Sequence, residues 1–158
     1  MRRTNESTFA CLPLLVATAL LLLPPPVSAQ DVGRASLILA RRQAEQLERE
    51  ERYAACGAVY RDIYERAPAD VHADEVLYNS GVCYEAAGLL LEAIRAYQLL
   101  ESRMPRSALV RRAIVRLGHA HETVADYGAA AEAYERYAAM FAGEKDAPRA
   151  LSNAIVYR

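Results

Sequence analysis

The sequence predicts an all-α solenoid, built of antiparallel helix pairs and preceded by an N-terminal export signal. Small and aromatic residues recur at a step of 37 residues, and within each repeat they follow the three-and-four spacing of a helix face. An apolar run near the N-terminus predicts the export signal. Of the 158 residues 53% are hydrophobic, and the formal net charge is −1, which fits a packed core. Without a basic excess, the composition does not predict binding to nucleic acid.

The N-terminal segment has the order of a secretory signal peptide. Arg2 and Arg3 precede an apolar run at about 9–23, and three prolines and then Val27-Ser28-Ala29 follow it. We therefore expect cleavage after Ala29. The apolar run is short for a membrane span, which needs roughly 20 residues. An uncleaved N-terminal anchor is the alternative.

These features define the expected organisation of the chain. The expected parts are a signal peptide at 1–29, a short linker at 30–34 and a helical repeat domain at 35–158. The protein is then exported, and its expected location is the periplasm or the outer membrane.

Six sets of positions agree on the 37-residue step. They are Ala44/Gly81/Gly118, Leu47/Tyr84/His121, Tyr53/Leu90/Tyr127, Cys56/Ala93/Ala130, Tyr60/Tyr97/Tyr134 and Ile63/Leu100/Tyr137. Agreement of six sets on one period predicts a repeat protein.

Each unit contains two helices joined by a tight turn. In the middle unit the small and apolar positions are Leu77, Ser80, Gly81 and Tyr84 on the first helix and Ala93, Tyr97 and Leu100 on the second. Gly88 is expected to take a left-handed conformation in the turn between them. Pro105 and Ser107 are expected to end the second helix and cap the next one. We expect residues 69–73 and 106–110 to start the following first helices early.

The spacing Leu77-x-x-Ser80-Gly81-x-x-Tyr84, followed by Ala93-x-x-x-Tyr97-x-x-Leu100 and Pro105, resembles the tetratricopeptide repeat. The resemblance extends over about residues 35 to 158, as three and a half repeats. The family's period is roughly 34 residues, and the longer unit found here is similar to repeats in bacterial envelope proteins. Outer-membrane-assembly lipoproteins and the periplasmic partner of the Tol-Pal system are examples.

The resemblance implies a non-catalytic scaffold or adaptor of the bacterial cell envelope, which binds other proteins or peptide segments in a concave groove. The family's register gives the groove positions as Glu75, Tyr78, Val82 and Glu85 from one unit and Arg112, Val115, His119 and Glu122 from the next. An ordinary solvated helix face is the alternative for these residues.

Some tetratricopeptide domains bind a terminal carboxylate with Lys, Arg and Asn side chains from three successive first helices. Carried over by register, the corresponding positions are Arg41, Glu45, Asn79, Arg112 and Arg116. Glu45 departs from the pattern, because a carboxylate repels the ligand and is expected to pair with Arg112 or Arg116 instead. A plain charged surface is the alternative to this clamp.

The sequence shows no residues for catalysis. A carboxylate pair, a nucleophile with a base and a Gly-rich phosphate loop are all missing at usable spacings. His119 and His121 point to different sides of one helix, and His121 is expected to be buried and hydrogen-bonded. We therefore expect no enzyme activity, cofactor, metal site or small-molecule substrate. Membrane association is expected only through partners or an uncleaved signal.

Cys56 and Cys83 lie on two helices that pack against each other in this architecture. Exported proteins hold disulfides, so a bridge between the two is one interpretation. Two buried free thiols are the other, since both positions favour small residues.

The sequence stops one helix into a fourth unit. The last expected helix, 147–158, carries Leu151, Ile155, Val156 and Tyr157, so we expect some apolar surface on it to remain uncovered. Two further hypotheses follow. The repeats are the N-terminal portion of a larger envelope machine or enzyme, of which the sequence is a fragment, or the chain self-associates through this helix.

Overall fold

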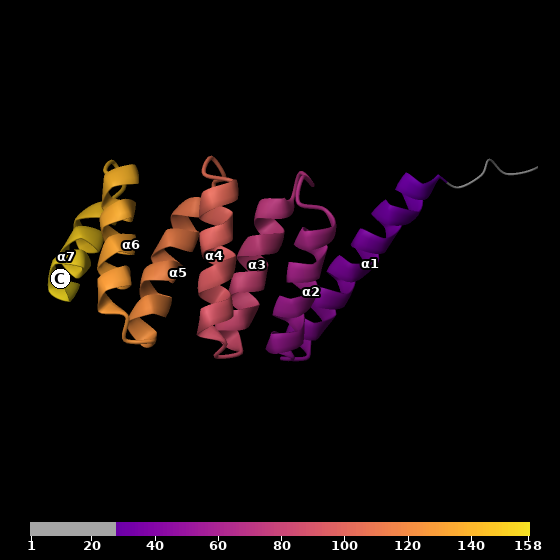
Figure 1. The fold of residues 1–158 in the computed structure, drawn as a ribbon, viewed down its shortest axis with the longest axis horizontal. Helices are drawn as coiled ribbons and strands as arrows, with labels where there is room; N and C mark the ends of the chain where they lie inside the picture. The colour runs from indigo at the N-terminus through magenta and orange to yellow at the C-terminus, as the bar shows by residue number, and fades with distance from the viewer. Residues whose placement is uncertain (1–27) are drawn as a thin grey trace, which may run out of the picture. The chain divides into compact units, whose positions relative to one another are not determined.

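The computed structural model describes residues 28–158, and helices account for most of them (Figure 1). The seven helices of this part are α1 (Ala29–Arg49), α2 (Tyr53–Arg66), α3 (Ala73–Ala86), α4 (Leu90–Arg103), α5 (Val110–Thr123), α6 (Tyr127–Met140) and α7 (Ala147–Tyr157). Residues Arg34–Arg158 form one compact unit. Almost all of the expected signal peptide lies outside the described residues. None of the helices at 28–158 combines the length and the apolar character that a membrane span requires.

The residues of the expected linker at 30–34 form the start of α1. The Ser28 hydroxyl oxygen accepts a hydrogen bond from the Asp31 backbone N–H at 3.1 Å, and Asp31 stands in the positively polarised first turn. These two local interactions favour a helix start that the residue pattern of the repeat does not reveal.

From α2 to α7 the helices lie side by side in chain order, and successive helices pack against each other (Figure 1). The first helices of the units are α1, α3, α5 and α7, and the second helices are α2, α4 and α6. Two clusters of buried side chains fill the spaces between them, one among α1, α2 and α3 and one from α3 to α7. The prediction of an all-α solenoid of antiparallel helix pairs is confirmed.

Glycine allows the two helices of a unit to approach each other closely. A Cβ atom added to Gly81 would lie 2.3 Å from Cε1 of Tyr97, and one added to Gly118 would lie 2.7 Å from Cε1 of Tyr134. Both tyrosine rings come from the second helix of the same unit and are buried. Glycine and tyrosine therefore recur at a step of 37 residues because they form the same contact in both units. In this contact the tyrosine ring packs directly against the helix backbone at the glycine.

The turn between the two helices repeats with the same backbone conformation in every unit. Gly88 has the predicted left-handed conformation, with φ of 72°. One period away on either side, Glu51 and Ala125 have φ of 57° and 59°. Left-handed backbone is costly for residues that carry a Cβ, so two of the three turns are strained.

Replacing Ala125 with glycine is therefore expected to stabilise the protein by about 0.5 to 1 kcal/mol. Glycine removes the free-energy cost of a left-handed alanine, and part of this gain is lost because glycine makes the unfolded chain more flexible. Urea denaturation followed by circular dichroism measures the difference. Gly88→Ala is the matched control. A Cβ at Gly88 meets no atom within 4 Å, so conformational strain alone should destabilise that variant. An Ala125→Gly variant less stable than the wild type would contradict the explanation.

The three extra residues of each unit form a loop, which corrects the expectation of an early helix start. α3 begins only at Ala73 and α5 only at Val110. Asp70 and Ser107 each make the same two backbone hydrogen bonds, donating to the carbonyl three residues earlier and accepting from the N–H three residues later. Ser107 is consequently not the N-cap of α5, which is Leu109. Each loop therefore consists of two successive hydrogen-bonded turns, where the sequence predicted an additional turn of helix.

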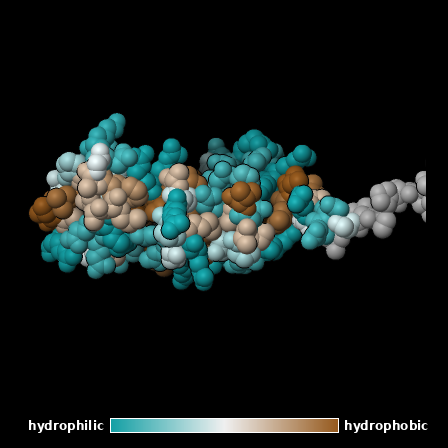
Figure 2. Space-filling view, turned by 90° about the horizontal axis from the view of Figure 1, so that it is seen from above, coloured by the Kyte–Doolittle hydropathy of each residue, from teal (hydrophilic) through white to brown (hydrophobic). Residues whose placement is uncertain are grey.

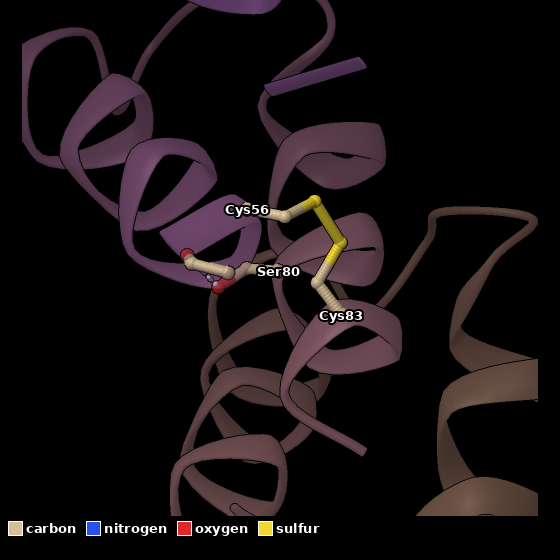
Figure 3. The surroundings of a disulfide bond; sticks show 4 residues. Cys56, Ser80 and Cys83 are labelled. Atoms are coloured by element: carbon tan, nitrogen blue, oxygen red, sulfur yellow. Dashed lines mark hydrogen bonds between the residues drawn. A yellow bond between two sulfur atoms is a disulfide. The ribbon is translucent and has the colours of Figure 1, made fainter. Parts of the chain in front are cut away.

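A disulfide joins Cys56 of α2 to Cys83 of α3, with the two Cα atoms 5.9 Å apart (Figure 3). Of the two interpretations of these cysteines, the structure contains the bridge. Beside it, the Ser80 hydroxyl donates a hydrogen bond of 2.9 Å to the Gly57 carbonyl. The first two units are thus linked by a covalent bond and by a buried hydrogen bond.

Candidate partner-binding groove

Two adjoining hollows form a groove along α5. The larger has a volume of about 520 Å³ and is lined by Tyr78, Glu85, Arg111, Arg112, Val115, Arg116, His119, Tyr137 and Asp146. The smaller, of about 200 Å³, is lined by Val115, His119, Tyr134, Tyr137, Asp146, Arg149, Ala150 and Asn153. Because the two share Val115, His119, Tyr137 and Asp146, they form one continuous groove between α3 and α7, with α5 as its floor.

Six of the residues that the sequence assigned to partner binding lie in this groove. They are Tyr78, Glu85, Arg112, Val115, Arg116 and His119. Glu122 adjoins it through His119, whose Nδ1 lies 3.2 Å from a Glu122 carboxylate oxygen. All the positions expected from the third unit, and two of those expected from the second, therefore belong to one surface.

The remaining predicted residues lie elsewhere. Arg41 and Glu75 line a separate hollow of about 420 Å³, between the first half of α1 and the start of α3. Val82 is half-buried and is not part of the groove lining. Asn79 is half-buried and is likewise not part of the groove lining.

The expected carboxylate clamp is not assembled. Arg41 forms an ion pair with Asp70 at 3.2 Å, outside the groove, and Arg116 pairs with Glu85 at 2.8 Å. Glu45 is exposed and takes neither of its expected partners, because Glu85 lies nearer to Arg116 across the α3–α5 contact. Arg112 is exposed, and within the described part of the chain it forms no ion pair, so its guanidinium faces the groove unoccupied.

Glu85 is the centre of a polar network on one wall of the groove. It accepts hydrogen bonds from the Tyr97 hydroxyl and from Arg116. Arg116 also donates from Nε to the Tyr78 hydroxyl at 3.1 Å, and its guanidinium lies 5.9 Å from the centre of the Tyr78 ring. Burial, reinforced by the hydrogen bond to Glu85, raises the pKa of Tyr97, so its hydroxyl remains a proton donor. The network fixes Tyr78 and Arg116 before any ligand arrives.

A carboxylate and tyrosine equivalent to Glu85 and Tyr97 form the same kind of pair one period later. Glu122 accepts a hydrogen bond of 2.6 Å from the Tyr134 hydroxyl, and His119 Nδ1 lies 3.0 Å from that hydroxyl. Partial burial works to raise the pKa of Glu122, but the hydrogen bonds from Tyr134 and His119 outweigh it and hold this pKa below its ordinary value. Glu122 is therefore an anion at neutral pH that orients the tyrosine and the histidine.

Sequence reasoning missed seven residues of the groove lining, which are Arg111, Tyr134, Tyr137, Asp146, Arg149, Ala150 and Asn153. Tyr137 was assigned to the core alone, yet the structure places it both in the core and in the groove lining. Asp146 comes from the loop before α7, and Arg111, which pairs with Glu144 of the same loop, precedes the predicted Arg112. The 37-residue step gave no indication of the loop residues, because side chains there differ between units.

His121 is buried as predicted, but the expected hydrogen bond is absent. Its Nδ1 lies 3.4 Å from an Asp126 carboxylate oxygen and makes no hydrogen bond within the described structure. The same register position holds Leu47 and Tyr84 in the other units, so it requires a side chain that fills space and not a particular polar partner. Residues 28–158 contain no cluster of His, Cys, Asp or Glu side chains that would hold a metal ion.

With this geometry established, comparisons with solved structures identify the fold. The tetratricopeptide-repeat domain of Sgt2 from Aspergillus fumigatus superposes with a TM-score of 0.57 at 24% sequence identity, covering 77% of this chain and 78% of that one. The fold is a tetratricopeptide-like solenoid. PcrH, solved in complex with the chaperone binding region of PopB, gives a TM-score of 0.56 at 12% identity, covering 78% and 95% of the two chains. No protein-family model matches the chain, and no curated protein sequence matches it.

Proposed function

We propose that this protein is a non-catalytic scaffold that binds a segment of another protein in the groove along α5, and that it acts in the bacterial cell envelope. The continuity of the groove is the observation on which the binding proposal rests. Two hollows that share four residues give an elongated surface, which suits a chain segment better than a compact small molecule. The signal-like order of residues 2–29 supports the location.

The lining indicates the chemistry of the bound segment. Val115 and the Tyr137 ring offer apolar contact at the centre of the groove. Arg112 offers a guanidinium whose five donors meet no carboxylate within residues 28–158, whereas Arg116 is already occupied by Glu85. A segment with an apolar side chain followed by a carboxylate satisfies both features.

Crosslinking within cells tests this proposal. A photoreactive phenylalanine analogue at His119, which lines both hollows, is expected to form a discrete adduct with another exported protein. The same analogue at Gln98, an exposed position on the second helix α4, is the matched control and should form none. Fractionation of the adduct into periplasm and membranes tests the location at the same time.

The contribution of Arg112 is tested in the same experiment. Arg112→Ala is expected to lower the yield of the adduct, because it removes the open cation of the groove. Arg103→Ala is the control, as Arg103 is likewise an exposed arginine near a helix end, but on α4. Equal adducts from His119 and Gln98, or none from His119, would refute the groove as the binding site.

A further inference from the structure

Two side chains fill the space between the first helices α3 and α5. The Arg116 guanidinium lies 5.9 Å from the centre of the Tyr78 ring, and its Nε donates a hydrogen bond of 3.1 Å to the Tyr78 hydroxyl. The centre of the Tyr78 ring also lies 6.0 Å from that of the buried Tyr97 ring. At this place in the solenoid, an aromatic ring of the chain itself therefore packs between two successive first helices.

The equivalent space between α5 and α7 holds smaller side chains. One period after Tyr78 stands Val115, and one period after Arg116 stands Asn153. Valine has no ring, and asparagine is shorter than arginine, so this pair leaves space that the earlier pair fills. The smaller hollow of the groove, of about 200 Å³, lies here, and both Val115 and Asn153 line it. The hollow thus corresponds to the place that a tyrosine occupies between α3 and α5.

Aromatic rings form much of the wall of this hollow, whose lining includes His119, Tyr134 and Tyr137. The rings of His119 and Tyr134 pack edge to face, with their centres 5.8 Å apart and their planes at 77°. Glu122 holds both of them, through the hydrogen bond from the Tyr134 hydroxyl and the contact with His119 Nδ1. These walls are ordered before a ligand arrives, which lowers the entropic cost of binding. Rings in such positions favour a further ring in edge-on or offset contact.

We propose that the bound segment inserts a tyrosine or phenylalanine ring into this hollow, in the place equivalent to that of Tyr78. The proposal rests on the groove being the binding site and adds the identity of the anchoring side chain. The inserted ring packs against Tyr134 as Tyr78 packs against Tyr97, with Val115 beside it. Arg112 lines the larger hollow and not this one, so a carboxylate of the same segment lies on that side of the ring.

A second apolar surface of α7 has to be distinguished from this hollow. Leu151, Ile155 and Val156 on the outward face of α7 are 49%, 70% and 76% exposed. Figure 2 shows apolar surface gathered at the end of the repeat domain where α7 lies. The expectation of uncovered apolar surface on this helix is confirmed. These three residues are not part of the groove lining, so a substitution can alter one surface and leave the other intact.

Selection from a library of random peptides displayed on phage, with the full chain as target, tests the anchor. We expect the enriched peptides to share a tyrosine or phenylalanine. Their affinity should fall by roughly tenfold or more for Val115→Tyr/Asn153→Arg, because the introduced pair fills the hollow as Tyr78 and Arg116 fill the earlier space. Ile155→Glu is the control. It changes the outward face of α7 and should bind the same peptides as the wild type does.

The filled double variant also tests the shape of the hollow without a peptide. Where the space matches a tyrosine ring, Val115→Tyr/Asn153→Arg should raise the urea midpoint of unfolding, since packed side chains replace a hollow. Val124→Tyr is the matched control, because Val124 is exposed at the end of α5 and outside the groove lining, and it should not raise the midpoint. A double variant less stable than the wild type would show that the ring does not fit and would overturn the proposal.

The selection separates failure of the anchor from failure of the groove. Enriched peptides that lack an aromatic residue would overturn the anchor and leave segment binding in place. Aromatic peptides that bind the double variant as tightly as the wild type, or that Ile155→Glu no longer binds, would overturn it too, because they occupy another surface. If no peptide were enriched, segment binding in the groove would itself be refuted, and the anchor with it.

Discussion

Replacing Gly81 with valine is expected to destabilise the repeat domain by about 3 kcal/mol or more, the upper end of what overpacking a core costs. The added Cβ would lie 2.3 Å from the Tyr97 ring, and the γ-methyl groups would extend further into it. Tyr97 has no room to withdraw, because it is fully buried and its hydroxyl is bound to Glu85. The helices α3 and α4 must then separate, which exposes the core between them.

Urea denaturation measures this loss, and Gly128→Val is the matched control. Gly128 lies in the first turn of α6, where an added Cβ meets no atom within 4 Å. Valine there should change stability little, since valine and glycine differ by only a few tenths of a kcal/mol in helix propensity. If the two variants were equally stable, the close approach of α3 and α4 at Gly81 would be wrong.

Removal of the disulfide is expected to have the second-largest effect. Cys56 and Cys83 are 27 residues apart, and closing a loop of that length stabilises the folded state by about 3.5 kcal/mol in the chain-entropy account. A Cys56→Ala/Cys83→Ala double variant should therefore melt roughly 10 °C below the wild type, given the size of the repeat domain. Alanine suits both sites, because each is buried and lies within a helix.

Reductant provides the control for this experiment. It should lower the melting temperature of the wild type toward that of the double variant and leave the double variant unchanged. Mass spectrometry of the intact wild type, before and after alkylation without reduction, reports whether Cys56 and Cys83 are accessible as thiols. A wild type whose melting temperature reductant does not alter would show that the bridge adds no stability.

The repeat made the helices and the core predictable. The contact between Gly81 and Tyr97 recurs at Gly118 and Tyr134, so the sequence repeats wherever the packing repeats. The loops were less predictable. Residues 69–73 were expected to start the next helix early, but successive turns satisfy the backbone around Asp70 instead.

The position of the candidate groove was predictable from the sequence. The ion pairs formed by its charged side chains were not. Register alone places Tyr78, Arg112 and Arg116 on the same concave surface. Register does not decide which carboxylate an arginine meets, because long side chains reach several neighbours across a helix contact. Glu85 of α3 therefore pairs with Arg116 of α5, although the sequence pattern suggested Glu45. Glu85 and Arg116 belong to two successive units, so the residue pattern within one unit does not reveal their pairing.

The disulfide also makes local stability differ along the solenoid. In a linear array each helix is held only by its neighbours, so opening begins where neighbours are fewest. The bridge between α2 and α3 anchors the early units, while within residues 28–158 the main packing partner of α7 is α6. Amide hydrogen exchange should accordingly be slowest near Cys83 and become faster toward α7. The wall of the groove formed by α7 is then the one that adjusts to a bound segment, and the wall formed by α3 keeps its shape.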